Sequence, residues 1–372
     1  MILNWGELIT LEYGKPVKDK ESTDGKVPVY GTNGQIGTSH LPAQCKHPSF
    51  ILGRKGAYRG VHYSDCPFSV IDTAFYAEPL TDRIDLKWAY YKFLTYDING
   101  MDSGSAIPST DRYQIYSIEV EVPPLEKQRK IVAVLDCIDR KININQKVND
   151  NLEQQAVALF KSWFVDFSLF GGTVPENWED TTLENITTLI TRGIAPKYSD
   201  NSDQTVVNQK CIRNHTIDLS LARTHTPKAI NEKWLKFGDL LINSTGDGTL
   251  GRVAQVWFAP KALTVDSHVT IVRPAREELI FYIGLWGILH EKEIESLHTG
   301  STGQTELPRD RVKMLKLLLP DNISLSRFNS IITPMASTII SNQEENQKLA
   351  SLRDTLLPKL MSGEIDVSNI QF

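Results

Sequence analysis

The side chains that could bind a charged ligand gather in two clusters, one around Arg54 inside a glycine-rich segment and one that begins at Lys210. The glycine-rich segments run from Ile51 to Gly60 and from Asn243 to Arg252. Lys and Arg contact phosphate groups, Arg reads guanine in the major groove of DNA, and Asn reads adenine. The clusters therefore fit a nucleic-acid surface, although solvated loops carry the same residue types. The residues that we assign to this surface are Arg54, Lys55, Tyr58, Arg59, Lys210, Arg213, Asn214 and Arg252.

The glycines of these segments allow two interpretations. Gly53, Gly56 and Gly60, or Gly246 and Gly248, could cradle a phosphate with their backbone amides. More often such glycines serve tight turns between strands, because glycine adopts backbone angles that other residues avoid. A turn of this kind can still present its neighbours to a ligand.

Motifs for catalysis are missing. The chain has no phosphate loop and no nucleophile elbow. The nearest match to an amino-methyltransferase signature, Val122-Pro123-Pro124-Leu125, lacks the polar first residue and the aromatic last residue. The four cysteines are scattered, and no His, Cys and carboxylate spacing suggests zinc. We therefore predict no active site, no metal and no cofactor in this chain.

Two long helices must position the clusters. Leu125–Phe170 follows Pro123-Pro124 and precedes Gly171-Gly172, and its apolar residues alternate in steps of four and three, as in a heptad repeat. Adding 197 to each position gives a second stripe of the same kind, with Asn in the same two places. Two ordinary core helices, each with surface Asn, would be the alternative. The predicted seam is Ile131, Leu135, Ile138, Ile142, Asn145, Asn149 and Leu152 against Phe328, Ile332, Met335, Ile339, Asn342, Asn346 and Leu349.

The repeat extends to the segments before the helices. Asn4-Trp5 matches Asn177-Trp178, Val70-Ile71-Asp72 matches Thr264-Val265-Asp266, and Gly104-Ser105 matches Gly300-Ser301. Short strands separated by Gly, Pro and Asn indicate a mixed α/β globule in each half. We predict an α+β fold in which two similar globules are separated by two long antiparallel helices that form a coiled coil with pseudo-twofold symmetry. The predicted parts are 1–122, 123–170, 171–320 and 321–372.

Composition limits the compartment and the partners. The chain has 372 residues and a net charge of −5, which argues against a strong autonomous nucleic-acid binder but leaves room for one basic face. The N-terminus lacks the features of a signal peptide, and the longest apolar run, Leu279–Leu289, is too short to span a bilayer. We expect a soluble cytoplasmic protein. Trp163, Phe164 and Phe167 either staple the first long helix to the next globule or add to a docking surface.

Several stretches resemble one known family. They are Val122 to Val132 (VPPLEKQRKIV), Leu159 to Phe167, Gly300-Ser301-Thr302-Gly303-Gln304, and Leu352 to Glu364 (LRDTLLPKLMSGE). In this order they are similar to the specificity subunits of type I restriction–modification systems, over the whole chain. The helical motifs carry the resemblance, because the globules of this family vary with the DNA target.

The resemblance implies a function without catalysis in this chain. Each globule would be a target recognition domain that reads one half of a split site in double-stranded DNA. The paired helices would set the unread spacer and dock two modification subunits, which bind S-adenosylmethionine and methylate adenine N6. Restriction subunits would supply ATP-driven translocation and cleavage. The second repeat departs from the first, since Pro320-Asp321-Asn322-Ile323 replaces the Pro-Pro and Glu-Lys-Gln run, so a contact made by the first repeat is expected to be absent there.

Two other functions remain open at this point. A self-contained modification enzyme would need methyltransferase motifs, which the sequence lacks. A protein–protein scaffold with two ligand-binding heads would have the same repeat and no affinity for DNA.

Overall fold

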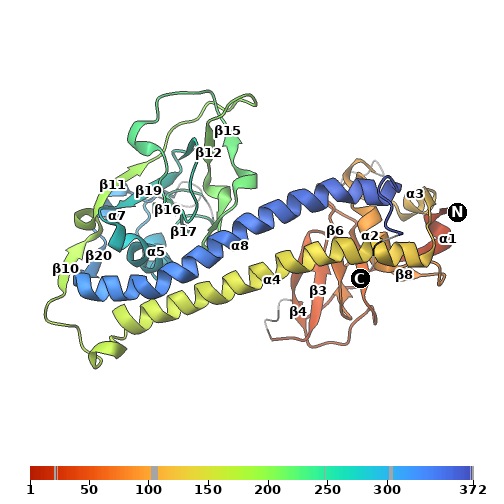
Figure 1. Ribbon diagram of the computed structural model, residues 1–372, viewed down its shortest axis with the longest axis horizontal. Coiled ribbons are helices and arrows are strands. Elements are labelled where there is room, and N and C mark those ends of the chain that lie inside the picture. The colour runs from red at the N-terminus through yellow and green to blue at the C-terminus, as the bar shows by residue number, and fades with distance from the viewer. Residues whose placement is uncertain are drawn as a thin grey trace. The chain divides into compact units, whose positions relative to one another are not determined.

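A computed structural model describes residues 1–20, 22, 24–101, 108–246, 248–300, 305–368 and 370. The chain forms two compact units, one of Met1–Asn143 with Asn346–Phe372 and the other of Ile144–Glu345. Each unit contains one globule and part of each long helix (Figure 1). The sequence suggested four parts, two globules and two helices. The structure has two units, because each globule packs on a part of both helices. The predicted motif positions Gly104-Ser105 and Ser301 to Gln304 lie outside the described residues, as does Asp247.

The long helices are α4 (Leu125–Phe164) and α8 (Asn322–Ser362). Helix α4 begins directly after Pro123-Pro124, as predicted, but ends six residues before the predicted Phe170. Phe167 takes a left-handed conformation with φ of 52°, which no α-helix of L-residues continues through. A short 3₁₀ turn, Ser168–Phe170, follows.

The two helices run antiparallel within each unit. In the first unit Arg353 Nη1 lies 3.1 Å from Asp139 Oδ1, and Asn346 donates to the carbonyl of Ile142 at 3.4 Å. Residue numbers therefore rise along α8 as they fall along α4. The second unit repeats this direction, and the structure exposes none of the predicted seam side chains.

The first globule contains three sheets. Their strand orders are β2-β8-β5-β6, β4-β3-β7 and β1-β9, and among the described residues only β3 and β7 pair in parallel. Short helices connect them. The elements are β1 (Ile2–Asn4), α1 (Trp5–Leu8), β2 (Ile9–Tyr13), β3 (Val27–Gly31), β4 (Gly34–Ser39), β5 (Ser49–Gly53), β6 (Val61–Ser64), β7 (Ser69–Val70), β8 (Ala74–Pro79), α2 (Leu86–Phe93), α3 (Arg112–Tyr116) and β9 (Glu119–Glu121).

The second globule repeats these sheets in the same order. They are β11-β19-β16-β17, β15-β12-β18 and β10-β20, with β12 and β18 parallel, and a hairpin of β13 and β14 is additional. The elements are β10 (Glu179–Thr182), β11 (Thr187–Arg192), β12 (Thr205–Val207), β13 (Ile212–Arg213), β14 (Thr216–Ile217), β15 (Arg223–Thr224), β16 (Leu240–Asn243), β17 (Val253–Gln255), β18 (Leu263–Val265), β19 (Val269–Pro274), α5 (Ile280–Leu289), α6 (Glu291–Ser296), α7 (Arg309–Lys313) and β20 (Lys316–Leu319).

Equivalent glycines show how closely the globules correspond. A Cβ on Gly14 would lie 2.1 Å from the carbonyl oxygen of Ile71, and one on Gly193 would lie 1.9 Å from that of Val265. In the first globule the residue after β2 thus touches the backbone next to β7. In the second globule the residue after β11 touches the backbone at the end of β18 in the same way. The internal repeat predicted from the sequence is present at this level of detail.

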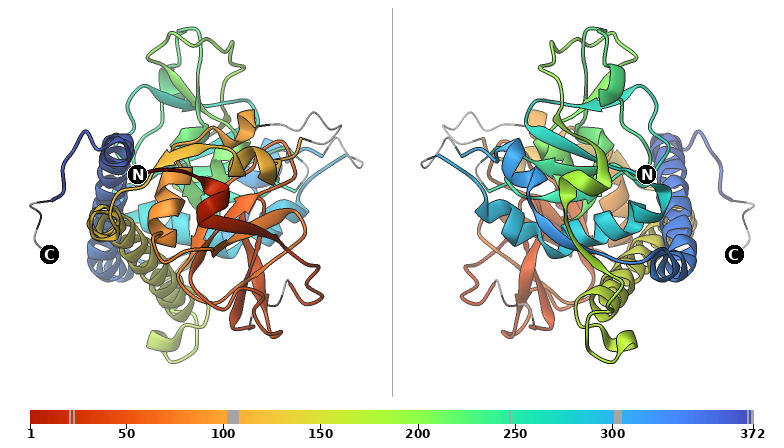
Figure 2. Two further views of the ribbon diagram at one scale, coloured as in Figure 1. Left: turned by 90° about the vertical axis from the view of Figure 1, so that its right-hand side faces the viewer. Right: turned by 90° about the vertical axis from the view of Figure 1, so that its left-hand side faces the viewer.

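Each globule buries its core against its own part of the helix pair (Figure 2). In the first unit Trp5, Trp88 and Phe93 share a core with Ile131 of α4 and Leu360 of α8. Gln128, fully buried, donates to the carbonyls of Arg83 and Pro123 and accepts from the Asp85 amide. The equivalent position in α8 is the apolar Leu325, so these contacts are absent from the second unit, as the sequence suggested.

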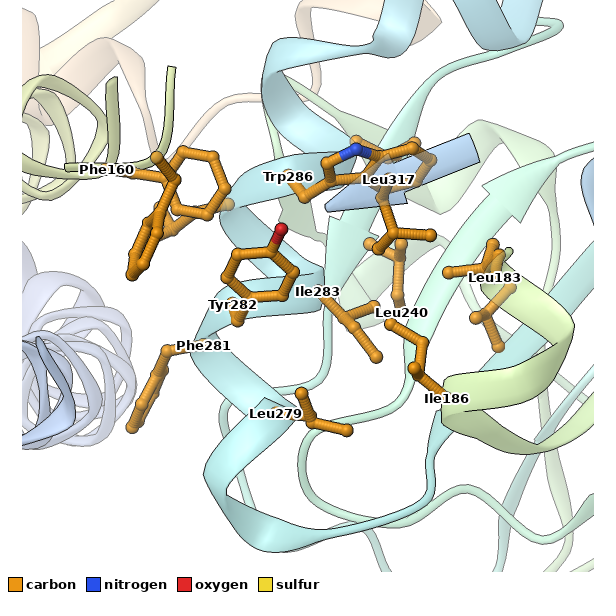
Figure 3. Close-up of a cluster of buried hydrophobic side chains, with 14 of the residues drawn as sticks. Phe160, Leu183, Ile186, Leu240, Leu279, Phe281, Tyr282, Ile283, Trp286 and Leu317 are labelled. Carbon is orange, nitrogen blue, oxygen red and sulfur yellow. The ribbon is translucent and has the colours of Figure 1, made fainter. Parts of the chain in front are cut away.

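In the second unit the aromatic end of α4 staples the helix to the globule. Phe164 lies 4.8 Å from Phe328, 5.1 Å from Tyr282 and 5.5 Å from Trp178, measured between ring centres. Figure 3 shows Phe160 beside Tyr282 at the edge of the same core. Trp163 and Phe164 are buried, so they belong to this core and offer no docking surface.

The apolar run Leu279–Leu289 forms α5 from Ile280 onward, and a second helix, α6, follows it. Helix α5 is almost wholly apolar and buried, and the polar α6 begins after His290. The backbone amide and Nδ1 of His290 both bond to the Trp286 carbonyl, which closes α5 at this residue. No helix in the described part of the chain has the length and apolar character needed to cross a membrane.

Candidate nucleic-acid interface

The glycine-rich segment of the first globule is a closed loop at the end of β5. The Gly53 amide donates to the Gly60 carbonyl at 2.8 Å, and Gly56 has a φ of 118°. A side chain on Gly53 would meet the Arg59 backbone at 2.8 Å. These glycines therefore serve a tight turn, which anchors the loop and leaves its tip, at Tyr58, 62% exposed.

Arg59, which the sequence placed among the DNA-contacting residues, is buried instead, with 2% of its surface exposed. Its guanidinium donates to the carbonyls of Gly56, Ile98 and Asn99. These bonds tie the loop to the segment after α2. Arg59 thus holds the loop in place and does not face solvent, because buried charges require such partners.

Two arginines and two tyrosines of the first globule stack together. The guanidinium of Arg54 lies 4.7 Å from the centre of the Tyr13 ring, and that of Arg112 lies 4.8 Å from it. Arg112 also lies 5.1 Å from the Tyr113 ring, which is 65% exposed. Among the residues that the structure describes, Arg112 has no carboxylate partner. Two guanidiniums at one aromatic ring, without that neutralisation, favour an anionic ligand.

These side chains form the first basic surface, which we define as Tyr13, Arg54, Lys55, Tyr58, Arg112 and Tyr113. Lys55 lies 3.8 Å from Asp72 at the surface, and both side chains stay partly exposed. Tyr13, Arg112 and Tyr113 were not found from the sequence, because they lie far from the glycine-rich loop in the chain.

The second glycine-rich segment is anchored by Gln209. Its side-chain oxygen accepts from Thr245 at 3.2 Å, and its backbone carbonyl accepts from the buried Asn243 at 3.0 Å. Lys210 follows Gln209 and is exposed. The structure therefore brings the Lys210 part of the second cluster to the glycine-rich segment, although 30 and more residues separate them in sequence.

The hairpin of β13 and β14 carries the rest of this cluster. Asn214 and His215 form its turn with φ of 50° and 58°, the backbone of a type I′ turn. Arg213 and Asn214 are exposed. His215 points back to the core of the unit, where Nδ1 lies 3.1 Å from Glu153 of α4 and Nε2 lies 3.5 Å from Glu291 of α6.

The His215 contacts have an electrostatic consequence. Hydrogen bonds that His215 donates to the carboxylates of Glu153 and Glu291 raise the pKa of His215 to about 9. The His215 imidazole is thus charged at neutral pH and clamps the hairpin to α4. Burial would raise the pKa of Glu291, but hydrogen bonds from His215 and the Val253 amide, together with the charges of His215 and half-buried Arg252, lower it.

Arg223, a neighbour of this cluster in sequence, stacks on Tyr198 at 3.7 Å from the ring centre. Both residues are exposed, whereas His225 beside them is fully buried. We define the second basic surface as Lys210, Arg213, Asn214 and Arg223 with Tyr198. Like the first surface, it combines cations with an aromatic ring, a combination suited to phosphate and base contacts.

The fold and these surfaces define a duplicated binding protein, in which one α+β globule occurs twice on a pair of heptad helices. Residues 4–154 match the family model of the type I restriction modification DNA specificity domain. The chain is 26% identical over 319 residues to the specificity subunit of the type I restriction enzyme MjaIX of Methanocaldococcus jannaschii, covering 78% of this chain and 71% of the relative. It is 21% identical over 353 residues to that of the HindI enzyme of Haemophilus influenzae, covering 74% of each.

A solved structure shares the fold. The S subunit of a type I restriction–modification system from M. genitalium aligns over 97% of this chain and 95% of its own, with a TM-score of 0.59 and 17% identity. The chain is thus similar in sequence to specificity subunits of type I restriction enzymes over most of its length, and residues 4–154 match the specificity domain.

Proposed function

We propose that this chain is the DNA-recognition subunit of a type I restriction–modification complex. Each globule reads one half of a bipartite target in double-stranded DNA through its basic surface. The observation that carries the proposal is the presence, in both copies of one duplicated fold, of arginines stacked on tyrosine, partly exposed in the first globule and exposed in the second. Phosphate contacts would position each globule, and arginine and asparagine would read base edges.

The chemistry belongs to partner subunits in this proposal. Two modification subunits bind S-adenosylmethionine and methylate adenine. Restriction subunits use ATP to translocate DNA and then cleave it. This chain is not an enzyme, and it supplies the docking platform. A net charge of −5 supports a shared clamp, because an acidic protein needs partners to hold DNA tightly at physiological salt. The proposed site of action is the cytoplasm, where such partners and their DNA meet.

The long helices have a separate role in the proposal. Leu125, at the start of α4, belongs to the first unit, and Phe164, at its end, belongs to the second. The number of residues in this unbroken helix, and in α8, then sets the length of the unread spacer between the half-sites.

Mapping methylated adenines in cells that express the full system tests the proposal. Exchanging residues 1–122 for the equivalent globule of a relative should change one half of the target and leave the other half intact. Exchanging the second globule should change only the other half. A target altered in both halves by either exchange would contradict the assignment of one half-site to each globule.

The two alternative functions give different results. A self-contained modification enzyme would methylate DNA when this chain alone is given S-adenosylmethionine. A protein–protein scaffold would leave the mobility of a target duplex unchanged even with the modification subunit present. We expect no turnover by the chain alone, and a specific shift with the modification subunit that a scrambled duplex does not show.

A further inference from the structure

One group of three side chains in the described part of the chain brings together ligand types that metals bind. Cys45, His47 and Glu78, all in the first globule, have ligand atoms within 4.8 Å of one another. Cys45 Sγ lies 3.9 Å from His47 Nε2, and His47 Nε2 lies 2.7 Å from Glu78 Oε2. A tetrahedral zinc ion holds its ligands at about 2.0–2.3 Å, which places ligand atoms roughly 3.2–3.8 Å apart. The group is therefore close to the dimensions of a zinc site.

The second nitrogen of His47 fixes the orientation of the ring. Nδ1 lies 3.0 Å from the Pro48 carbonyl oxygen, and a carbonyl can only accept, so Nδ1 carries the hydrogen. A backbone carbonyl on one ring nitrogen is the usual support of a histidine that binds metal through the other. A neutral His47 then presents a lone pair to the Glu78 carboxylate. A cation must lie between these two acceptors, and it is either a proton or a metal ion.

We propose that Cys45, His47 and Glu78 bind a zinc ion. Thiolate, imidazole and carboxylate together are ligands that zinc accepts. Cys45 is fully buried, while the side chains of His47 and Glu78 are 37% and 34% exposed. Water from the open side completes the fourth position. The Cys45 thiol releases its proton to solvent as the sulfur–zinc bond forms.

The position of the site indicates a structural clip. The backbones of Cys45 and Phe68 exchange two hydrogen bonds just before β7, His47 precedes β5, and Glu78 lies near the end of β8. The ion would join the three-stranded sheet to the four-stranded sheet of the first globule. None of the ligands belongs to the first basic surface, so this site goes beyond the proposed function. The corresponding clip is not expected in the second globule, which has no Cys and His pair of this spacing.

Cobalt(II) titration of the purified full chain, stripped of metal with a chelator, tests the proposal directly. Cobalt takes the place of zinc and gives a thiolate charge-transfer absorption band only when sulfur is a ligand. We expect one cobalt per chain, a charge-transfer band, and loss of that band when one equivalent of zinc is added. Zinc should also raise the Tm of the stripped chain. If no band appears with the folded wild-type chain, a proton occupies the site and the proposal is overturned.

Variants separate this site from adventitious binding. Cys45→Ser should abolish the charge-transfer band, and the milder Glu78→Gln, at a partly exposed position, should keep the fold and weaken zinc binding at least tenfold. His40→Ala is a matched control, since His40 pairs with Asp24 at 3.2 Å at the surface. Cys66→Ser controls for an exposed thiol. Equal loss of binding in the controls, or none in Glu78→Gln, would refute the assignment.

Discussion

The side-chain amide of Asn342 on α8 donates a hydrogen bond to Asn149 Oδ1 on α4, at 2.8 Å. A second pair, Asn145 to Glu345 at 2.7 Å, lies a turn away. Polar groups inside an apolar seam are satisfied only when the helices are aligned so that these partners meet. The two bonds therefore set the register of the helix pair at some cost in stability.

The Asn149–Asn342 bond predicts opposite effects for single and double substitutions. Asn342→Ala should lower the free energy of unfolding by about 1 kcal/mol, since Asn149 loses its partner. Replacing both residues by Leu should raise it, because apolar packing then fills the seam. Urea denaturation measures both changes, and Asn143→Ala, at an exposed α4 position, should be neutral. A stabilising Asn342→Ala would show that the bond does not form.

The seam was predictable because the two long helices share a local periodicity and a constant offset of 197 residues. Residue spacing does not, however, reveal which side chains from distant parts of the sequence meet in the folded chain. Tyr13 and Arg112 meet only because β2 and α3 pack together, and Glu78 reaches Cys45 only through strand pairing. Arg59 has the same local sequence context as Arg54, yet one guanidinium is buried on carbonyls and the other is stacked at the surface. Burial of this kind depends on the fold and could not be read from composition.

The contrast between Arg59 and Arg54 gives a second prediction. Arg59→Ala should destabilise the chain by about 2–4 kcal/mol, because three backbone carbonyls lose a charged donor. Arg54→Ala should leave the thermal midpoint nearly unchanged and weaken DNA binding by the assembled complex. Thermal unfolding and duplex titration with the modification subunits measure the two effects. If the Arg59→Ala chain is soluble and fully stable but binds DNA less well, Arg59 contacts DNA and does not serve to hold the loop.

Arg112 gives a prediction about ionic strength. If its guanidinium neutralises a phosphate, Arg112→Gln should reduce the slope of log affinity against log salt by about 1. The loss should be similar for target and non-target duplexes, because phosphate contacts carry no sequence information. Arg83→Gln, at an exposed position just before α2 and outside the first basic surface, serves as the comparison. A changed target preference with an unchanged slope would instead assign Arg112 to base reading.

His215 predicts a stability difference that depends on pH. The pKa of His215 is raised to about 9 in the folded chain from about 6.5 when unfolded. Its contribution is therefore fully present below pH 6.5 and is lost as pH rises through 9. His215→Gln should cost on the order of 1 kcal/mol near pH 6, after allowance for solvent screening at a half-buried site, and almost nothing at pH 10. Denaturation of both chains across this range measures the difference, and a constant difference would exclude the ion pairs.

The length of the helix pair predicts the spacing of the DNA target. Seven residues inserted into both α4 and α8 keep every seam position facing its partner and lengthen each helix by about 10 Å. At about 3.4 Å per base pair, the spacer between the half-sites should grow by roughly three base pairs, with the half-sites unchanged. Seven residues in α4 alone should lower stability, because Asn149 and Asn342 no longer meet. Methylation mapping reads the spacer in each case, and an unchanged spacer in the stable double insertion would show that the helices do not set it.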